Sequence, residues 1–206
     1  MPSERYRDSR IFACFAEMLD YPHPGLLCAV GKGAEILEAD RPQAAALLES
    51  FHEFLETTPA SRVEEIYTAT FDFAGTFHPY IGHHLLGDSY KRSALLVGLK
   101  ERYRACGFAA GSELPDHLAV VLRFLAVCRD DKLAQELIGE ALLPALNKML
   151  RQPECDSEQA ENDLALETGK DALEARSYRL VLQALKAALE PPPLDVHEPP
   201  PGTEPT

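Results

Sequence analysis

Apolar residues recur at three- and four-residue steps along most of the chain, a spacing that predicts amphipathic helices. Such stripes run through residues 11–19, 26–39, 42–57, 61–75, 133–149 and 172–189. No segment alternates apolar and polar residues over a length that would indicate a strand. The pattern therefore predicts an all-α fold, with a single compact helical domain over residues 1–190.

Several helix boundaries carry local signals. Ser61 and Glu64 have the spacing of a capping box, which predicts that a helix begins at Ser61. Pro144 lies inside the stripe of residues 133–149 and is expected to kink that helix, because proline cannot donate a backbone hydrogen bond. The remaining residues, 191–206, are rich in proline and have almost nothing to bury. We expect this tail to be disordered or polyproline-like.

Residues 87–126 form the pattern around which the rest is organised, two amphipathic helices separated by a sharp break. Gly107 is placed to end the first helix as a C′ glycine. Pro115 is tolerated only if the second helix begins about there. Asp116 would then lie in the first helical turn, where the helix dipole favours a carboxylate, with His117 beside it. The sequence thus predicts two polar side chains at the start of a helix.

A second group of candidate residues precedes this hairpin. The stretch of residues 76–84 contains aromatic and histidine side chains, among them Tyr80 and His84. Loops carry function more often than packed elements do, so this stretch is a candidate binding surface. Tyr67 and Phe71, at near-helical spacing, are core residues in most helices, but a tyrosine can also line a groove with an apolar body and a polar tip.

Charge narrows the class of partner. The 206 residues are 46% hydrophobic, enough for a true core, and carry a formal net charge of -13. An acidic protein is repelled by a nucleic-acid backbone and by an anionic membrane surface, so a basic peptide is the better match. The five cysteines form no C-x-x-C pair, which indicates reduced thiols. With no signal-peptide pattern and no apolar run of about 18 residues, we expect a soluble cytoplasmic protein.

Four elements in order resemble a known family. They are the tyrosine-bearing stretch YTATFDF at residues 67–73, the GD-x-x-K/R element at residues 87–92, a helix ending KERYRACGF, and the ELPDHL motif at residues 113–118. Together they resemble the nitrate reductase delta subunit (NarJ) branch of the TorD/DmsD family, over about residues 10–149. This resemblance implies an all-helical cytoplasmic chaperone for molybdenum enzymes rather than an enzyme.

The resemblance also implies a partner and a mode of action. Its members bind the N-terminal leader peptide of the catalytic subunit of a molybdenum oxidoreductase, nitrate reductase or a relative of the DMSO reductase family. They keep that subunit open while bis-molybdopterin guanine dinucleotide is inserted, before membrane targeting or export. No cofactor would be held permanently, and a monomer or a weak homodimer is expected. The candidate peptide-binding residues are Asp116, His117, Glu113, Pro115, Tyr80, Tyr67, Phe71 and His84, and Lys91 and Arg92 are candidates for transient contact with the phosphates of the cofactor.

Two other classes stay open. His78, His83, His84, Asp88, Asp116 and His117 are of the types that bind metal, so a helical metal-dependent hydrolase is an alternative, although no H-x-x-x-H or H-E-x-x-H pair is present. A structural assembly subunit, which would stay with its partner, is the other. No serine lies in a G-x-S-x-G context and no cysteine beside an evident base, which argues against nucleophilic catalysis.

Overall fold

The computed structural model describes residues 9–71, 77–151 and 169–190. Across these ranges the secondary structure is helical, and the only β-type contact is an isolated antiparallel bridge between Tyr80 and His117. The predicted all-α class is therefore confirmed. The expectation of a disordered tail concerns residues 191–206, which lie outside the described ranges.

The described helices follow the apolar stripes closely. In chain order they are α1 (Arg10–Met18), α2 (Leu26–Leu37), α3 (Pro42–Thr57), α4 (Ala60–Phe71), α5 (Ile81–Leu86), α6 (Tyr90–Ala105), α7 (Leu118–Val127), α8 (Asp131–Leu137), the π-helical turn η1 (Ile138–Leu142), α9 (Leu143–Arg151) and α11 (Gly169–Leu189). The short helix α5 was not predicted, because a single turn and a half gives too few positions for a periodic pattern.

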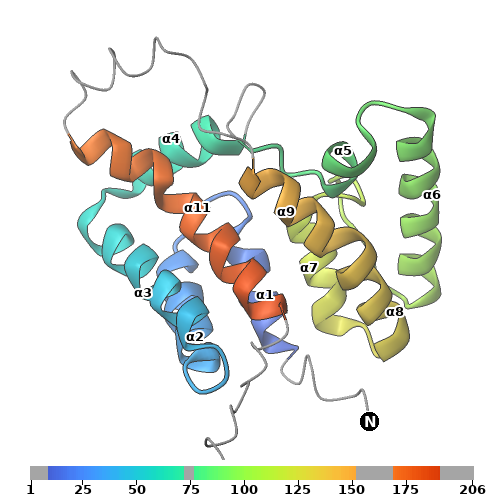
Figure 1. The fold of residues 1–206 in the computed structure, drawn as a ribbon, viewed down its shortest axis with the longest axis horizontal. Coiled ribbons are helices and arrows are strands. Elements are labelled where there is room, and N and C mark those ends of the chain that lie inside the picture. Colours follow the sequence, from blue (N-terminus) through green and yellow to red (C-terminus); the bar gives the residue numbers. More distant parts are fainter. Residues whose placement is uncertain (1–8, 72–76, 152–168, 191–206) are drawn as a thin grey trace, which may run out of the picture.

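The helices pack around α1 and α11 (Figure 1). Helix α1 lies between α2 and α7, α2 pairs with α3, and α11 crosses both α3 and α9. On the other side of the molecule α5 packs on α9 and η1, while α6 stands at the edge and contacts α5. The fold thus places α2, α3 and α4 on one side and α5 and α6 on the other, with the core between them.

Two of the predicted local signals, at Ser61 and at Pro144, can be compared with the structure. Helix α4 begins at Ala60, so Ser61 lies inside its first turn and the predicted capping box is wrong; the carbonyl oxygen of Pro59 accepts the first backbone bonds instead. The kink expected at Pro144 takes the form of η1, where the N–H of Leu143 donates to the carbonyl of Ile138. Such a π-helical turn accommodates the missing proline donor without breaking the helix.

The end of α6 is as predicted. Gly107 has a φ of 70°, and its N–H donates to the carbonyl of Arg104. The N–H of Phe108 donates to the carbonyl of Tyr103 at 2.8 Å, and the two aromatic rings lie 5.2 Å apart. This is a complete Schellman motif with its hydrophobic contact. It turns the chain sharply toward residues 113–118.

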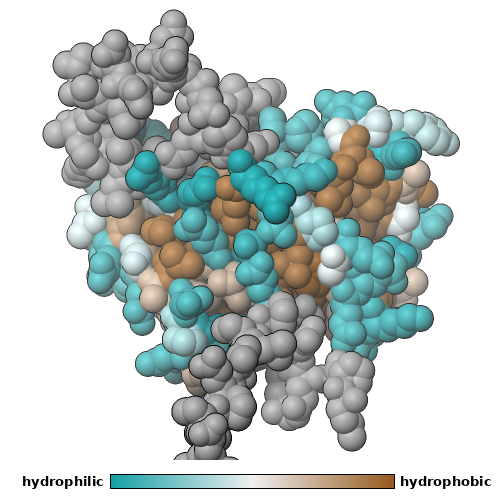
Figure 2. Space-filling model, viewed as in Figure 1, coloured by the Kyte–Doolittle hydropathy of each residue, from teal (hydrophilic) through white to brown (hydrophobic). Residues whose placement is uncertain are grey.

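The surface seen in Figure 2 is mostly polar, and apolar side chains show mainly along the two sides of α11 and near α5. Among the described residues no helix is both long and apolar enough to cross a lipid bilayer.

Candidate functional site

The stretch before α5 is joined to the turn before α7, although the two are more than 30 residues apart. The N–H of Ile81 donates to the carbonyl of Asp116 at 2.9 Å, and the N–H of Leu118 donates to the carbonyl of Pro79 at 2.7 Å. Tyr80 and His117 lie between these bonds as a β-bridge. The structure therefore brings the two groups of predicted residues into one site, which we call the Asp116 corner: residues 77–83, 88, 92 and 113–118.

Asp116 does not lie in a helical turn as predicted. Helix α7 begins at Leu118, and His117 is its N-cap residue with an extended backbone, φ −66° and ψ 134°. The segment before it is fixed by other bonds, because the hydroxyl of Tyr103 donates to the carbonyl of Pro115 at 2.8 Å and the N–H of His117 donates to the carbonyl of Leu114. Pro115 therefore belongs to a turn and not to the first position of the helix.

The carboxylate of Asp116 is the central group of the corner and is 0% exposed. Its Oδ2 accepts a hydrogen bond from Nε of Arg92 at 3.0 Å. Nη1 of Arg92 donates to Oδ1 of Asp88 at 3.2 Å, and its guanidinium lies 5.4 Å from the centre of the Tyr80 ring. The GD-x-x-K/R element of residues 87–92 and the turn of Pro115 to His117, recognised separately in the sequence, are thus joined by Arg92.

One oxygen of this buried carboxylate has an incomplete environment. Among the described residues, no donor reaches Oδ1 of Asp116. A buried anion is costly unless all its lone pairs are satisfied, and half-satisfied buried charges gather at functional sites. Gly82 of α5 packs directly against the other oxygen, since a Cβ at that position would lie 2.6 Å from Oδ2. The carboxylate is therefore held tightly on one side and incompletely bonded on the other.

His117 caps helix α7 and faces Tyr80. Its Nδ1 accepts from the N–H of Ala119 at 3.2 Å, so the unprotonated nitrogen is the one used for capping. The rings of Tyr80 and His117 meet edge to face, with centres 5.4 Å apart. Burial lowers the pKa of His117 below its usual value, and the nearby carboxylates of Glu113 and Asp116 oppose this shift without cancelling it. The imidazole is therefore neutral near pH 7.

A histidine cluster borders the corner. The rings of His78 and His83 are 4.4 Å apart, and Nε2 of His84 lies 2.8 Å from the carbonyl oxygen of His78. Burial lowers the pKa of His84, and His83 faces Asp88 at 3.7 Å. Within the described residues, no three or more histidine, cysteine, aspartate or glutamate side chains are grouped so that they could hold a metal ion.

The other predicted residues are more scattered. Phe71 is buried and Tyr67 partly buried in an aromatic cluster with Tyr178 of α11, at ring distances of 5.0 to 5.4 Å. Phe71 belongs to the hydrophobic core and Tyr67 packs against it, so Phe71 is not exposed on a groove wall, and a peptide contact by the partly exposed Tyr67 stays a prediction. Glu113 and Lys91 are exposed, so they are accessible to a partner. Periodicity alone could not separate these cases, because it gives the buried face of a helix but not what covers that face.

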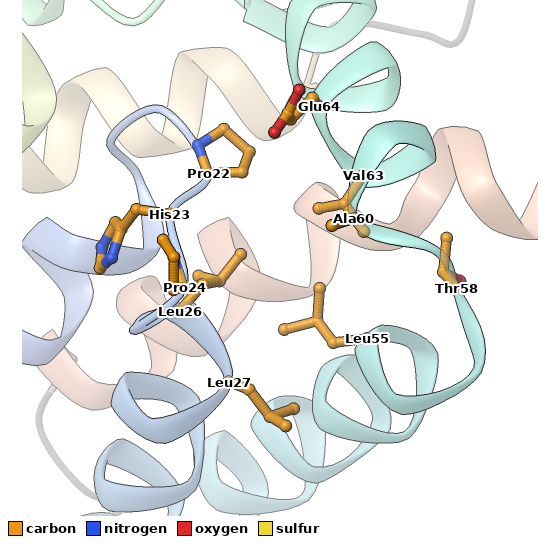
Figure 3. A pocket seen from close by; sticks show the side chains of 10 residues that line it. All are labelled: Pro22, His23, Pro24, Leu26, Leu27, Leu55, Thr58, Ala60, Val63 and Glu64. Carbon is orange, nitrogen blue, oxygen red and sulfur yellow. The ribbon is translucent and has the colours of Figure 1, made fainter.

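Sequence reasoning missed a pocket on the other side of the molecule. It has a volume of about 330 Å³ and lies where the loop before α2 meets the connection from α3 to α4 (Figure 3). The lining residues are Pro22, His23, Pro24, Leu26, Leu27, Leu55, Thr58, Ala60, Val63 and Glu64. The available signals were the prolines of residues 22–24 and Pro59, which mark two chain breaks but do not show that the breaks face each other. We call it the Pro22–Glu64 pocket.

Comparison with known families gives a match. A family model described as "Nitrate reductase delta subunit" matches residues 37–154, more than half of the chain. The matched range contains the whole Asp116 corner. No curated protein matches the chain.

Proposed function

Since the chain belongs to the nitrate reductase delta subunit family, an assembly-chaperone family, we propose that it binds the N-terminal peptide of a molybdoenzyme catalytic subunit at the Asp116 corner. The client would be nitrate reductase or a relative, held in the cytoplasm until its molybdenum cofactor is inserted. The chaperone must bind the immature client more tightly than the mature one, because equal affinity for both states would shift no population.

The observation that carries this proposal is the incomplete hydrogen bonding of the Asp116 carboxylate. Oδ1 is buried and has no donor partner among the described residues, while Oδ2 is fixed by Arg92. A guanidinium or amide of a client peptide would supply the missing donor, and a charge-assisted bond to a carboxylate is among the stronger hydrogen bonds in proteins. Because Asp116 is 0% exposed, a peptide reaches Oδ1 only when the residues that cover it move outward.

The surroundings fit a peptide with basic character. Glu113 is exposed beside the corner, and the net charge of -13 attracts a cationic segment over longer distances. The partly exposed Tyr80 offers an aromatic face next to His117. Apolar contact with this face and a paired cation together give the mixed recognition that an amphipathic leader requires.

Transient contact with the phosphates of the molybdenum cofactor would use the cations at the start of α6. Lys91 is exposed near the start of α6 and offers a point charge for a phosphate. Arg92 already contacts two carboxylates, so a phosphate would have to compete with both. Lys91 is therefore the better candidate of the pair.

Calorimetric titration with a synthetic N-terminal peptide of the catalytic subunit tests the function. Micromolar binding is expected. In Asp116→Asn, at a temperature where circular dichroism shows that the variant is folded, binding should weaken about tenfold or more, which corresponds to about 1.4 kcal/mol. Asp40→Asn is the matched control, because Asp40 is an exposed aspartate between α2 and α3, on the opposite side of the molecule. Absence of binding by the wild-type chain would contradict the proposal. Stable co-purification with the mature enzyme would favour the assembly-subunit alternative.

A further inference from the structure

The Pro22–Glu64 pocket lies far from the Asp116 corner and has no role in the function described above. Its walls come from α2, α3, α4 and the loop before α2, whereas the corner is built from α5, α6 and the turn before α7. Figure 1 places these two sets of helices on opposite sides of α1 and α11. A ligand in the pocket would therefore occupy a second, separate surface.

The pocket wall is apolar and partly open to solvent. Leu27, Leu55 and Val63 face Pro22 across it (Figure 3). Leu27 is 40% exposed although it lines the pocket, and the neighbouring Tyr21 is 54% exposed. Single exposed apolar residues are common, but an exposed leucine at the mouth of a concave apolar pocket is the arrangement expected where a partner's apolar side chain is buried.

The edge of the pocket is acidic. Glu64 lies at this edge, beside Pro22. Among the described residues its Oε2 accepts only a long bond, from the hydroxyl of Tyr21 at 3.4 Å. Nearby, Glu17 contacts His23 at 2.8 Å and Asp20 pairs with Arg123, so those two carboxylates are already occupied. None of the described lining residues is a lysine or an arginine. The carboxylate of Glu64 is thus the charge that an incoming cation would meet.

We propose that the Pro22–Glu64 pocket binds an apolar side chain of a basic peptide, with an adjacent arginine or lysine of that peptide paired to Glu64. Charge complementarity selects this occupant, because the acidic edge and the net charge of -13 disfavour an anionic lipid surface. The inference rests on the proposed function for the identity of the peptide, a segment of the same client. Two separate contacts on one client raise the overall affinity without either being strong.

Two surface substitutions test the pocket. Leu27→Asp places a charge in the apolar wall, and Glu64→Gln removes the charge at the edge. Each is expected to weaken binding of a client segment long enough to reach both surfaces about tenfold. The effect of Glu64→Gln should shrink in high salt, because screening already weakens that ion pair. Val127→Asp is the matched control, since Val127 is 58% exposed at the end of α7 and does not line the pocket. Unchanged circular dichroism and melting temperatures would show that all three variants fold.

The pattern of losses separates the pocket from the corner. Full affinity for that longer segment in both Leu27→Asp and Glu64→Gln, with affinity lost in Asp116→Asn, would overturn the pocket and leave the proposed function standing. If the wild-type chain does not bind the client peptide, a short acetylated peptide of leucine and arginine, unrelated to the client, is titrated instead. Binding of that probe that is lost in Leu27→Asp would support the pocket, and no binding would overturn it. If the wild-type chain is a dimer that Leu27→Asp dissociates while peptide binding is unaffected, the pocket binds a second copy of this chain. That result would overturn the proposal that a basic peptide occupies it.

Discussion

Replacing Arg92 by methionine should destabilise the fold severely, because it removes the only cation that contacts Asp116 among the described residues. Methionine keeps an unbranched stem of similar shape, so packing near Gly82 is largely retained while the charge and the donors are lost. The carboxylate of Asp116 would then be buried with neither oxygen bonded to a side-chain donor. The change therefore isolates the cost of an unpaired buried charge.

The burial of the two partners sets the magnitude. Asp116 is 0% exposed and the Arg92 side chain 17% exposed, which makes this a largely buried ion pair. Removing one partner of such a pair costs about 3–5 kcal/mol. The second contact of Arg92, to Asp88, adds little, because the Asp88 side chain is 81% exposed and surface pairs contribute about 0–1 kcal/mol. In a protein of this size, 3 kcal/mol lowers the melting temperature by about 6–12 °C.

Urea denaturation of four proteins measures the effect: wild type, Arg92→Met, Asp116→Leu and the double variant. The double variant should recover most of the lost stability, because replacing both members of a buried pair by apolar groups is often neutral. Asp88→Asn, which removes only the exposed contact, serves as the control and should lose less than about 1 kcal/mol.

Two results would refute this reasoning. If Arg92→Met unfolds at the same urea concentration as wild type, Asp116 is hydrated in solution. Alternatively, a double variant no more stable than Arg92→Met would show that the apolar packing of the Arg92 stem, and not its charge, stabilises the corner.

Three further predictions concern stability. In thermal melts, Gly82→Ala should lower the free energy of unfolding by about 1–3 kcal/mol, because the new Cβ would overlap the buried carboxylate of Asp116. Its control is Gly98→Ala in α6, where a Cβ meets nothing within 4 Å, and it should raise the free energy of unfolding by about 0.5–1 kcal/mol. Burial lowers the pKa values of His84 and His117 below 6.5, so as the pH falls the unfolded chain takes up protons before the folded protein does. The urea concentration at the unfolding midpoint should therefore be steady above about pH 7 and fall toward about pH 5.5. The fall should be smaller in His117→Asn, because asparagine keeps a capping acceptor but does not titrate. Tyr178→Phe should raise the free energy of unfolding by about 1 kcal/mol in urea titrations, because the buried hydroxyl has no hydrogen-bond partner among the described residues. A lower free energy of unfolding in this variant would show that the hydroxyl does have a partner.

The helices were predicted well wherever the signal was local. Helix α3 spans Pro42–Thr57 as its proline and its apolar stripe indicated, and α6 ends at the Schellman motif of Gly107. These features depend on residues within a few positions of one another, since a proline at the first turn and a glycine at C′ act on adjacent backbone groups. The family resemblance rested on the same kind of short ordered elements, and the match over residues 37–154 confirms it.

The start of α7 was predicted wrongly for a nonlocal reason. Pro115 is well suited to a first helical turn, but its carbonyl accepts from the hydroxyl of Tyr103, 12 residues earlier. His117 then caps a helix that begins at Leu118, three residues later than expected. The sequence near Pro115 is compatible with both starts, and the contact from Tyr103 selects one.

By itself, the sequence determined that the chain is helical, where most helices lie, and which family it belongs to. Only the tertiary structure decided that Asp116 is buried against Arg92, that Phe71 belongs to the core, and that the chain breaks near Pro22 and Pro59 enclose a pocket. The physical reason is the range of the interactions. Helix propensity, capping and periodicity act over a few residues, whereas burial, ion pairing and cavity shape depend on which distant segments meet, and no short stretch of sequence specifies that.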